Sequence, residues 1–240
     1  MMHNPGDRLF QLFKPMIWLV LFGSAGGALV SLSGIASGLN YQQFMLPGIL
    51  LNTVLVTSMG YGINLKWESE IGILSRILVA PVSRLSIVVG KALSSVLSSL
   101  LESAVFLILA SVIQVKFSHD VLALSVSVLV IILYSIGAAS LGMIFAILLR
   151  SREAYTGVVG MVSFPSLFAS NSLFSLNQMP LWLRIMARLN PVTYGVDSIR
   201  RLLIYRSLDP VPLLTDILVV LVTSLLVLAI AVVLFRRLEH

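Results

Sequence analysis

Apolar residues run along the chain in six long stretches, and about 20 such residues are needed for a helix to cross a bilayer. No charged residue occurs between Lys14 and Lys66, and the polar stretch Asn40-Tyr41-Gln42-Gln43 divides this run into two. Charged or polar turns separate the others. The pattern predicts an all-α integral membrane protein with six transmembrane helices in a single domain, 1–240. The predicted spans are 15–36, 44–64, 87–113, 121–149, 155–176 and 213–235.

The composition agrees with this class. Hydrophobic residues make up 58% of the chain and charged residues only 11%, whereas a soluble domain carries about 25% charged residues. The absence of cysteine excludes disulfides and thiolate metal sites. The three histidines are scattered, so no metal site is expected. The basic residues do not cluster on one polar face, so no nucleic-acid partner is expected either.

The basic residues also predict an orientation, because Lys and Arg are enriched in cytoplasmic loops. With six spans and both termini in the cytoplasm, ten basic residues fall inside and six outside. The five arginines between residues 180 and 206 fall outside and weaken this bias. The inner set is Arg8, Lys14, Lys66, Arg76, Arg84, Lys91, Arg150, Arg152, Arg236 and Arg237; the outer set is Lys116, Arg184, Arg188, Arg200, Arg201 and Arg206.

The segment between the second and third spans has the pattern of a short amphipathic helix. Ile71, Leu74 and Leu78 share one helical face. Glu68 supplies a polar position, and Pro81 ends the helix. Such a helix on the inner membrane surface can lie in the interface as an anchor or dock on a partner protein. The periodicity alone leaves both roles open.

Two motifs in the sequence are Glu68-x-Glu70-x-Gly72-x-Leu74 with Leu78-x-x-Pro81 and Gly90-Lys91, and Leu189-Asn190-Pro191-x-x-Tyr194-x-x-Asp197-x-x-Arg200. They resemble those of type-2 ABC exporter permeases, the family that includes bacterial drug-resistance, nodulation-factor and polysaccharide exporters. Lys14-Pro15 at the start of the first span is a third, weaker match. The chain departs from the family at Ile73 and Ser75, where Thr and Glu are common, which leaves the subfamily and substrate open.

The resemblance implies a permease subunit of an ABC exporter in the prokaryotic inner membrane. Two permease copies, as a homodimer or a heterodimer, would move a drug, polysaccharide or lipid by alternating access. Two separate ATPase subunits would bind ATP and Mg²⁺. The coupling helix to the ATPase would carry Glu68, Glu70, Gly72, Leu74, Arg76, Leu78 and Pro81. A re-entrant segment on the outer side would carry Asn190, Pro191, Tyr194, Asp197 and Arg200.

The chain itself is not expected to hydrolyse ATP or to bind a cofactor. A phosphate-binding loop has the form G-x-x-x-x-G-K-[ST]. The Gly90-Lys91 pair has Leu85 in place of the first glycine and Ala92 in place of the hydroxyl residue. The alternative function is a secondary carrier driven by an ion gradient. Carriers usually have several ionisable groups inside the membrane, and here Glu102 is the main candidate.

Two residues inside the spans have both a functional and a structural interpretation. Glu102 could face the transport pathway or the dimer interface, or it could be satisfied by Ser98, Ser99 or a neighbouring helix. Pro165 would kink the fifth span and could also serve as a gate.

The mixed segment 180–206 also has two interpretations. It could form re-entrant helices, as the resemblance implies, or a surface amphipathic hairpin. In the hairpin, Trp182, Tyr194 and Tyr205 would be anchors in the membrane interface.

Overall fold

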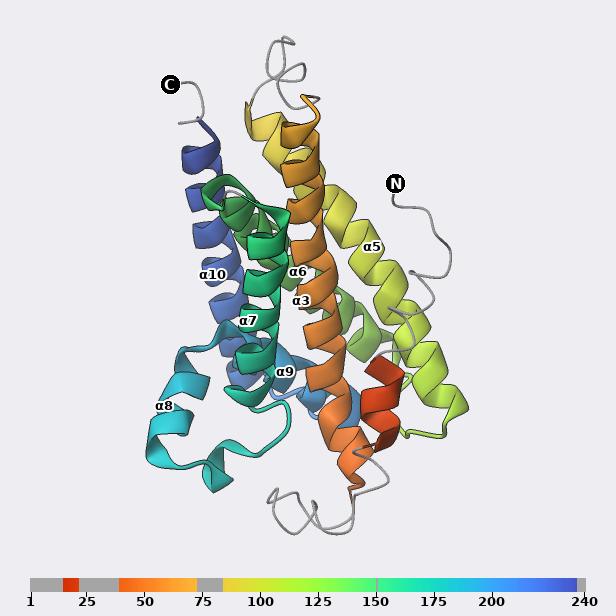
Figure 1. Cartoon of the computed structure of the whole chain (residues 1–240). Helices are drawn as coiled ribbons and strands as arrows, with labels where there is room; N and C mark the ends of the chain where they lie inside the picture. The colour runs from red at the N-terminus through yellow and green to blue at the C-terminus, as the bar shows by residue number, and fades with distance from the viewer. Residues whose placement is uncertain (1–14, 22–38, 73–83, 150, 237–240) are drawn as a thin grey trace.

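The computed structural model describes residues 15–21, 39–72, 84–149 and 151–236, and every regular element among them is a helix. Residues 15–21 form a short helix near the start of α3. Four of the described helices are long, namely α3, α5, α6 and α10. In the chain, a shorter helix, α7, and a series of small helices follow α6 and precede α10 (Figure 1). The elements are α3 (Tyr41–Glu70), α5 (Arg84–Val112), α6 (Val121–Leu148), α7 (Arg152–Phe168), η1 (Leu176–Gln178), α8 (Leu181–Leu189), α9 (Pro191–Arg200), η2 (Arg201–Tyr205) and α10 (Pro210–Arg236).

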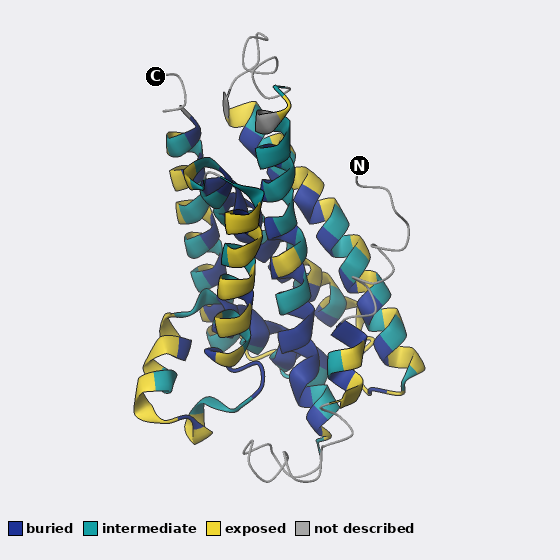
Figure 2. Cartoon of the chain, viewed as in Figure 1, coloured by how far each residue is buried: buried dark blue, intermediate teal, exposed yellow. Residues whose placement is uncertain are grey.

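In Figure 1, α3, α6 and α10 run upward through the bundle and α5 and α7 run downward, with α6 packed against α3, α5 and α10. We call the two ends of the bundle by their places in Figure 1. The upper end holds the ends of α3 and α10 and the starts of α5 and α7, whereas the lower end holds α8, α9 and the starts of α3, α6 and α10. Figure 2 shows buried residues concentrated where the lower part of α3 meets its neighbours.

Four helices in the described part of the chain are long and apolar enough to cross a membrane. They correspond to the second, third, fourth and sixth predicted spans. Most of the first predicted span, 15–36, lies outside the described residues, so the full set of six spans remains a prediction. The four ranges are Tyr41–Glu68, Leu85–Val112, Val121–Leu148 and Pro210–Phe235.

The fifth predicted span differs from the helix that is observed. The sequence predicted a span from 155 to 176, but α7 ends at Phe168, and Pro165 lies in its last turn. The polar run after the helix explains the early end, since serine side chains compete with the helix for backbone groups. Ser170 Oγ donates to the Leu167 carbonyl at 3.1 Å and shares a hydrogen bond with Ser172 Oγ at 2.7 Å.

Glycines allow a close approach between α3, α6 and α7. A Cβ atom added to Gly62 of α3 would lie 2.4 Å from the carbonyl oxygen of Gly142 in α6. The same atom would clash with the hydroxyl of Tyr155, which donates a hydrogen bond from α7 to the Met59 carbonyl. Small residues of this kind let helix backbones pack closely inside membranes.

Candidate functional site

The predicted outer motif begins at Asn190, which fixes the start of α9. Its Oδ1 atom accepts a hydrogen bond from the Val192 backbone N–H at 3.1 Å, as an N-cap side chain does. Its Nδ2 atom donates to the Ala169 carbonyl at 2.8 Å, just beyond the end of α7. Pro191 follows in the first turn, where its missing N–H costs no helical hydrogen bond. The Asn-Pro pair therefore starts α9 and ties it to the end of α7.

Tyr194 of the motif and its neighbour Thr193 join α9 to α8. Thr193 Oγ1 donates to the Ala187 carbonyl at 2.6 Å, and the Tyr194 hydroxyl donates to the Arg188 carbonyl at 2.8 Å. Both acceptors belong to the last turn of α8, whose carbonyl groups have no partner within the helix. The side chains of α9 thus complete the hydrogen bonds of α8, and the two helices form one unit.

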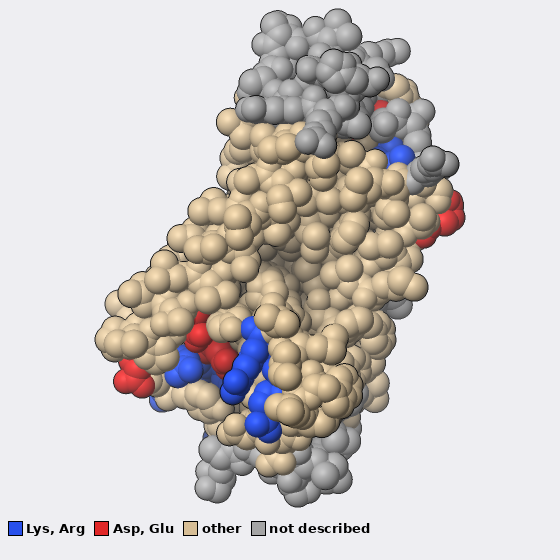
Figure 3. Space-filling view, turned by 90° about the vertical axis from the view of Figure 1, so that its left-hand side faces the viewer, with Lys and Arg blue, Asp and Glu red and all other residues tan. Residues whose placement is uncertain are grey.

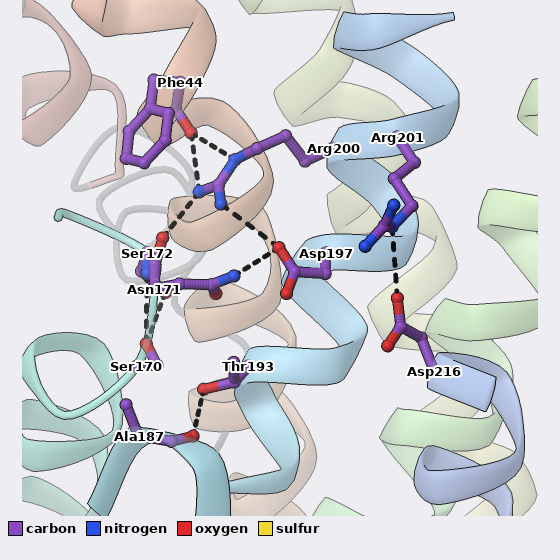
Figure 4. Close-up of polar contacts among 10 residues, drawn as sticks. All are labelled: Phe44, Ser170, Asn171, Ser172, Ala187, Thr193, Asp197, Arg200, Arg201 and Asp216. Carbon is purple, nitrogen blue, oxygen red and sulfur yellow. Dashed lines mark hydrogen bonds and ion pairs between the residues drawn. The ribbon is translucent and has the colours of Figure 1, made fainter. Parts of the chain in front are cut away.

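Arg200 is the most buried charge of this region, with 3% of its side chain exposed. It donates to the Phe44 carbonyl from Nη2 at 3.1 Å and to the Asn171 carbonyl at 2.7 Å (Figure 4). Its Nη1 atom lies 3.6 Å from Asp197 Oδ1. A guanidinium offers five donors in a fixed plane, and this site matches them with three oxygen acceptors from three parts of the chain.

Asp197 carries the negative charge that pairs with the positive charge of Arg200. Asn171 Nδ2 donates a hydrogen bond to the same Oδ1 atom that faces Arg200. Burial raises the pKa of the Asp197 carboxyl above its ordinary value, and the positive charges of Arg200 and Arg201 act in the opposite direction. A buried charge is costly to leave without a partner, so Asp197 and Arg200 depend on each other.

A second ion pair continues the network into the last long helix. Arg201 Nε lies 3.4 Å from Asp216 Oδ2, and Asp216 is 8% exposed near the start of α10 (Figure 4). Figure 3 shows charged side chains gathered at the lower end of this face, with an uncharged stretch above them. We name these four residues, Asp197, Arg200, Arg201 and Asp216, the charge network.

The loop between α7 and η1 is held against α3 at the same place. The Tyr41 hydroxyl donates to the Leu173 carbonyl at 3.0 Å. A Cβ atom on Gly48 would lie 2.4 Å from Ser172 Cβ, so only glycine fits here. This contact positions Asn171 between Arg200 and Asp197. The charge network and this loop together connect α3, α9 and α10 through hydrogen bonds and ion pairs.

The sequence identified part of this network and missed the rest. It singled out Asp197 and Arg200 from the motif, and the structure pairs them. It missed Phe44, Asn171 and Asp216. Asp216 could have been found, because an acid inside the predicted span 213–235 is as unusual as Glu102. Phe44 and Asn171 each meet Arg200 through a backbone carbonyl, and no sequence pattern reveals such a contact.

Polar pairs also connect α3 and α5. Thr57 Oγ1 donates to the Glu102 carboxylate, and the hydroxyls of Tyr61 and Ser98 share a hydrogen bond one turn further up. In the structural interpretation, a neighbouring helix supplies a hydrogen bond to Glu102, and Thr57 of α3 supplies one. A role of Glu102 in the pathway or the dimer interface stays a prediction, as does a role of Pro165 as a gate.

The predicted coupling residues are only partly described. Glu68 forms an ion pair with Lys91, with 2.5 Å between Oε1 and Nζ. Gly72 has a φ of 74°, the left-handed conformation that glycine adopts readily just beyond a helix end. The side chain of Glu70 and the residues Leu74, Arg76, Leu78 and Pro81 lie outside the described part, so the coupling helix remains a prediction.

These features define a multi-pass helical membrane protein with a polar, ion-paired segment at one end. The model of the ABC-2 type transporter family matches residues 1–204, and the chain belongs to this family. It is 32% identical to a putative transport permease, ycf38, of Cyanophora paradoxa over 216 residues, which are 85% of this chain and 70% of the relative.

Drug-resistance permeases are more distant relatives. The chain is 23% identical to the daunorubicin resistance ABC transporter permease protein DrrB1 of Streptomyces coeruleorubidus, over 84% of this chain and 70% of the relative. It is 22% identical to the probable multidrug ABC transporter permease YbhR of Escherichia coli strain K12, over 74% of this chain and 50% of the relative.

Proposed function

We propose that this chain is the membrane subunit of an ABC exporter and moves its substrate by alternating access, driven by a separate ATPase. The observation that carries the proposal is the family match over residues 1–204. The names of the drug-resistance and multidrug relatives favour an amphipathic cargo, with polysaccharide and lipid as the other classes of the resemblance.

The upper end of the bundle faces the cytoplasm in this proposal, with both termini on that side of the prokaryotic inner membrane. Lys66, Lys91 and Arg152 lie toward this end in the described chain. The arginines of α8, α9 and η2 lie at the opposite end. The predicted coupling segment then extends from the cytoplasmic end of α3, where an ATPase can reach it.

The mechanism uses two copies of the chain and two ATPase subunits. The ATPases bind ATP and Mg²⁺, and their closure moves the coupling segment as a rigid lever. In the chain, this segment follows α3 and precedes α5, so its movement would reach the two helices directly. At the other end, the charge network holds α9 against α3 and α10 and has to shift with them when the outer side opens.

The test is transport by the purified permease in sealed vesicles, with and without its ATPase. The ATPase is found by co-purification with the tagged permease from its native membrane. We expect uptake of an amphipathic dye only when the ATPase and ATP are present. An ATPase with its phosphate-loop lysine replaced is the matched control, because it binds the permease without hydrolysis. ATP-independent uptake that follows an ion gradient would instead identify a secondary carrier.

A further inference from the structure

An open cavity of about 360 Å³, with charged and polar side chains in its lining, lies between α3 and α5 near the upper end of the bundle. The candidate span of α3 ends at Glu68, and that of α5 begins at Leu85, so the cavity lies near the depth where a bilayer changes from acyl chains to headgroups. Its polar and aromatic lining consists of Tyr61, Asn64, Trp67, Glu68, Lys91 and Ser94.

The cavity presents one positive and one negative charge side by side. Lys91 Nζ lies 2.5 Å from Glu68 Oε1, and the two side chains are 22% and 23% exposed, so both can be reached by a ligand. Glu68 Oε2 is buried and has no hydrogen-bond partner among the described residues. A carboxylate oxygen without a donor is costly when buried. Glu68 therefore lacks one N–H or O–H donor, and a ligand can supply it once the carboxylate turns Oε2 toward the cavity.

An apolar track leads from the cavity toward the middle of the bundle. Leu97 and Leu101 of α5 are 66% and 70% exposed. They follow Ser94 by three and seven residues, which places all three on one face of the helix. A ligand with a charged head in the cavity can lay its apolar part along this face. Such a ligand has the form of a membrane lipid.

We propose that the cavity binds the headgroup of an aminophospholipid, with the phosphate on Lys91 and the primary ammonium on Glu68. A simple anion would face the Glu68 carboxylate, and a simple cation would face the Lys91 ammonium. A headgroup that carries both charges satisfies both residues. A quaternary ammonium has no N–H to donate to Glu68 Oε2, so the chemistry selects a primary amine over choline. Asn64 and Ser94 supply further polar groups for the phosphate oxygens.

This site needs only a folded chain in a bilayer and does not depend on coupling to an ATPase. Its failure and that of the proposed transport function are therefore separate outcomes. Binding can be measured on the permease alone, with no ATP or ATPase present.

Trp67 in the cavity lining is a built-in probe for the experiment. The chain has three tryptophans, and replacing Trp18 and Trp182 with Phe leaves Trp67 as the single fluorophore. The protein is placed in phosphatidylcholine vesicles that contain a small share of a lipid with brominated acyl chains, which quench a nearby indole. We expect brominated phosphatidylethanolamine to bind the site about tenfold more tightly than brominated phosphatidylcholine or phosphatidylglycerol. It should therefore quench Trp67 at about one tenth of the share of lipid that the other two need. Equal quenching by the three lipids would overturn the proposal.

Variants then assign the selectivity to the two charges. Lys91→Gln and Glu68→Gln should each reduce the preference for phosphatidylethanolamine to the level of phosphatidylcholine, and Lys91→Arg should retain it. Lys116→Gln and Glu153→Gln change exposed charges elsewhere and should leave the preference intact. Size-exclusion profiles identify any variant that misfolds. If a Gln variant misfolds, the lipid preference of Lys91→Arg and of the unmodified charges still tests the proposal. A preference that survives both Gln variants would show that this cavity is not the site.

A final arm separates a lipid from a soluble ligand with the same headgroup. Free phosphoethanolamine should relieve the quenching by brominated phosphatidylethanolamine, but only at concentrations far above those of the lipid, since it lacks the apolar contacts with Leu97 and Leu101. If it binds the cavity while phosphatidylethanolamine shows no preference over phosphatidylcholine, the ligand is a soluble aminophosphate and the lipid assignment is wrong.

Discussion

The guanidinium of Arg200 in α9 lies over the ring of Phe44 in α3, with its central carbon 3.9 Å from the ring centroid. The same guanidinium donates to the backbone carbonyl of Phe44 from Nε at 3.3 Å and from Nη2 at 3.1 Å. One residue of α3 thus contacts Arg200 through both its ring and its backbone. A planar, delocalised cation suits this double contact, and a lysine ammonium does not.

Replacing Arg200 should destabilise the lower end of the bundle strongly. Arg200→Ala leaves the half-buried Asp197 carboxylate without its main partner. Breaking a fully buried ion pair costs about 3–5 kcal/mol, and the 27% exposure of Asp197 lowers the cost toward the bottom of that range. The measurement is the thermal unfolding midpoint of the purified protein in detergent.

The matched variant is Asp197→Asn with Arg200→Met, which removes both charges together. It should be more stable than Arg200→Ala alone, because no uncompensated charge remains. Equal unfolding midpoints for wild type and Arg200→Ala would show that the network does not contribute to stability.

Gly62→Ala should destabilise the contact between α3 and α6, because the added Cβ atom would lie 2.4 Å from the Gly142 carbonyl oxygen. Overpacking of this kind costs about 1–3 kcal/mol. Gly60→Ala is the control on the same helix, since no atom lies within 4 Å of a Cβ there. It should be neutral or slightly stabilising, as alanine favours a helix more than glycine does. Similar unfolding midpoints for the two variants would contradict the close packing.

Single cysteines can test the orientation, because the native chain has none. Cysteines at Gln42 and Asp209, beside the starts of α3 and α10, should react with an impermeant maleimide added to intact cells. Cysteines at Ser75 and Ser151 should react only after the cells are opened. Labelling of Ser75→Cys in intact cells would reverse the orientation and remove the predicted coupling segment from the cytoplasm.

The coupling prediction is tested by reversing two charges, Glu70→Lys together with Arg76→Glu. We expect weaker co-purification of the ATPase or hydrolysis that no longer drives transport, since charges at an interface set partner choice. The membrane part should still insert, because no predicted span is altered. Lys116→Glu is the control at the opposite end of the bundle. Wild-type coupling in the double variant would leave the segment as an interfacial anchor only.

Glu102→Gln tests whether the carboxylate inside α5 takes part in transport. Glutamine keeps an oxygen that can accept the hydrogen bond from Thr57, so the unfolding midpoint should change little. Substrate-stimulated ATP hydrolysis should fall if the negative charge faces the pathway, and we expect this fall. Full activity of Glu102→Gln would assign the residue to helix packing alone.

The apolar runs of the sequence predicted α3, α5, α6 and α10, because a helix that crosses a bilayer must hide its backbone polar groups and present apolar side chains over its whole length. The start of α9 also follows from local chemistry, because Asn190 caps the helix and Pro191 lies in its first turn. These features depend on residues that are neighbours in the chain. They can therefore be read from the sequence.

The partners of Arg200 depend on the tertiary structure. Phe44 lies 156 residues away in the sequence and Asn171 lies 29 away, and both offer a backbone carbonyl, a group that every residue has. The position of the loop after α7 was also decided by packing, since the polar residues that follow Phe168 are held against α3 and α9. Side-chain chemistry marks a residue as a helix former or a charge, but folding alone determines which distant backbone groups it meets.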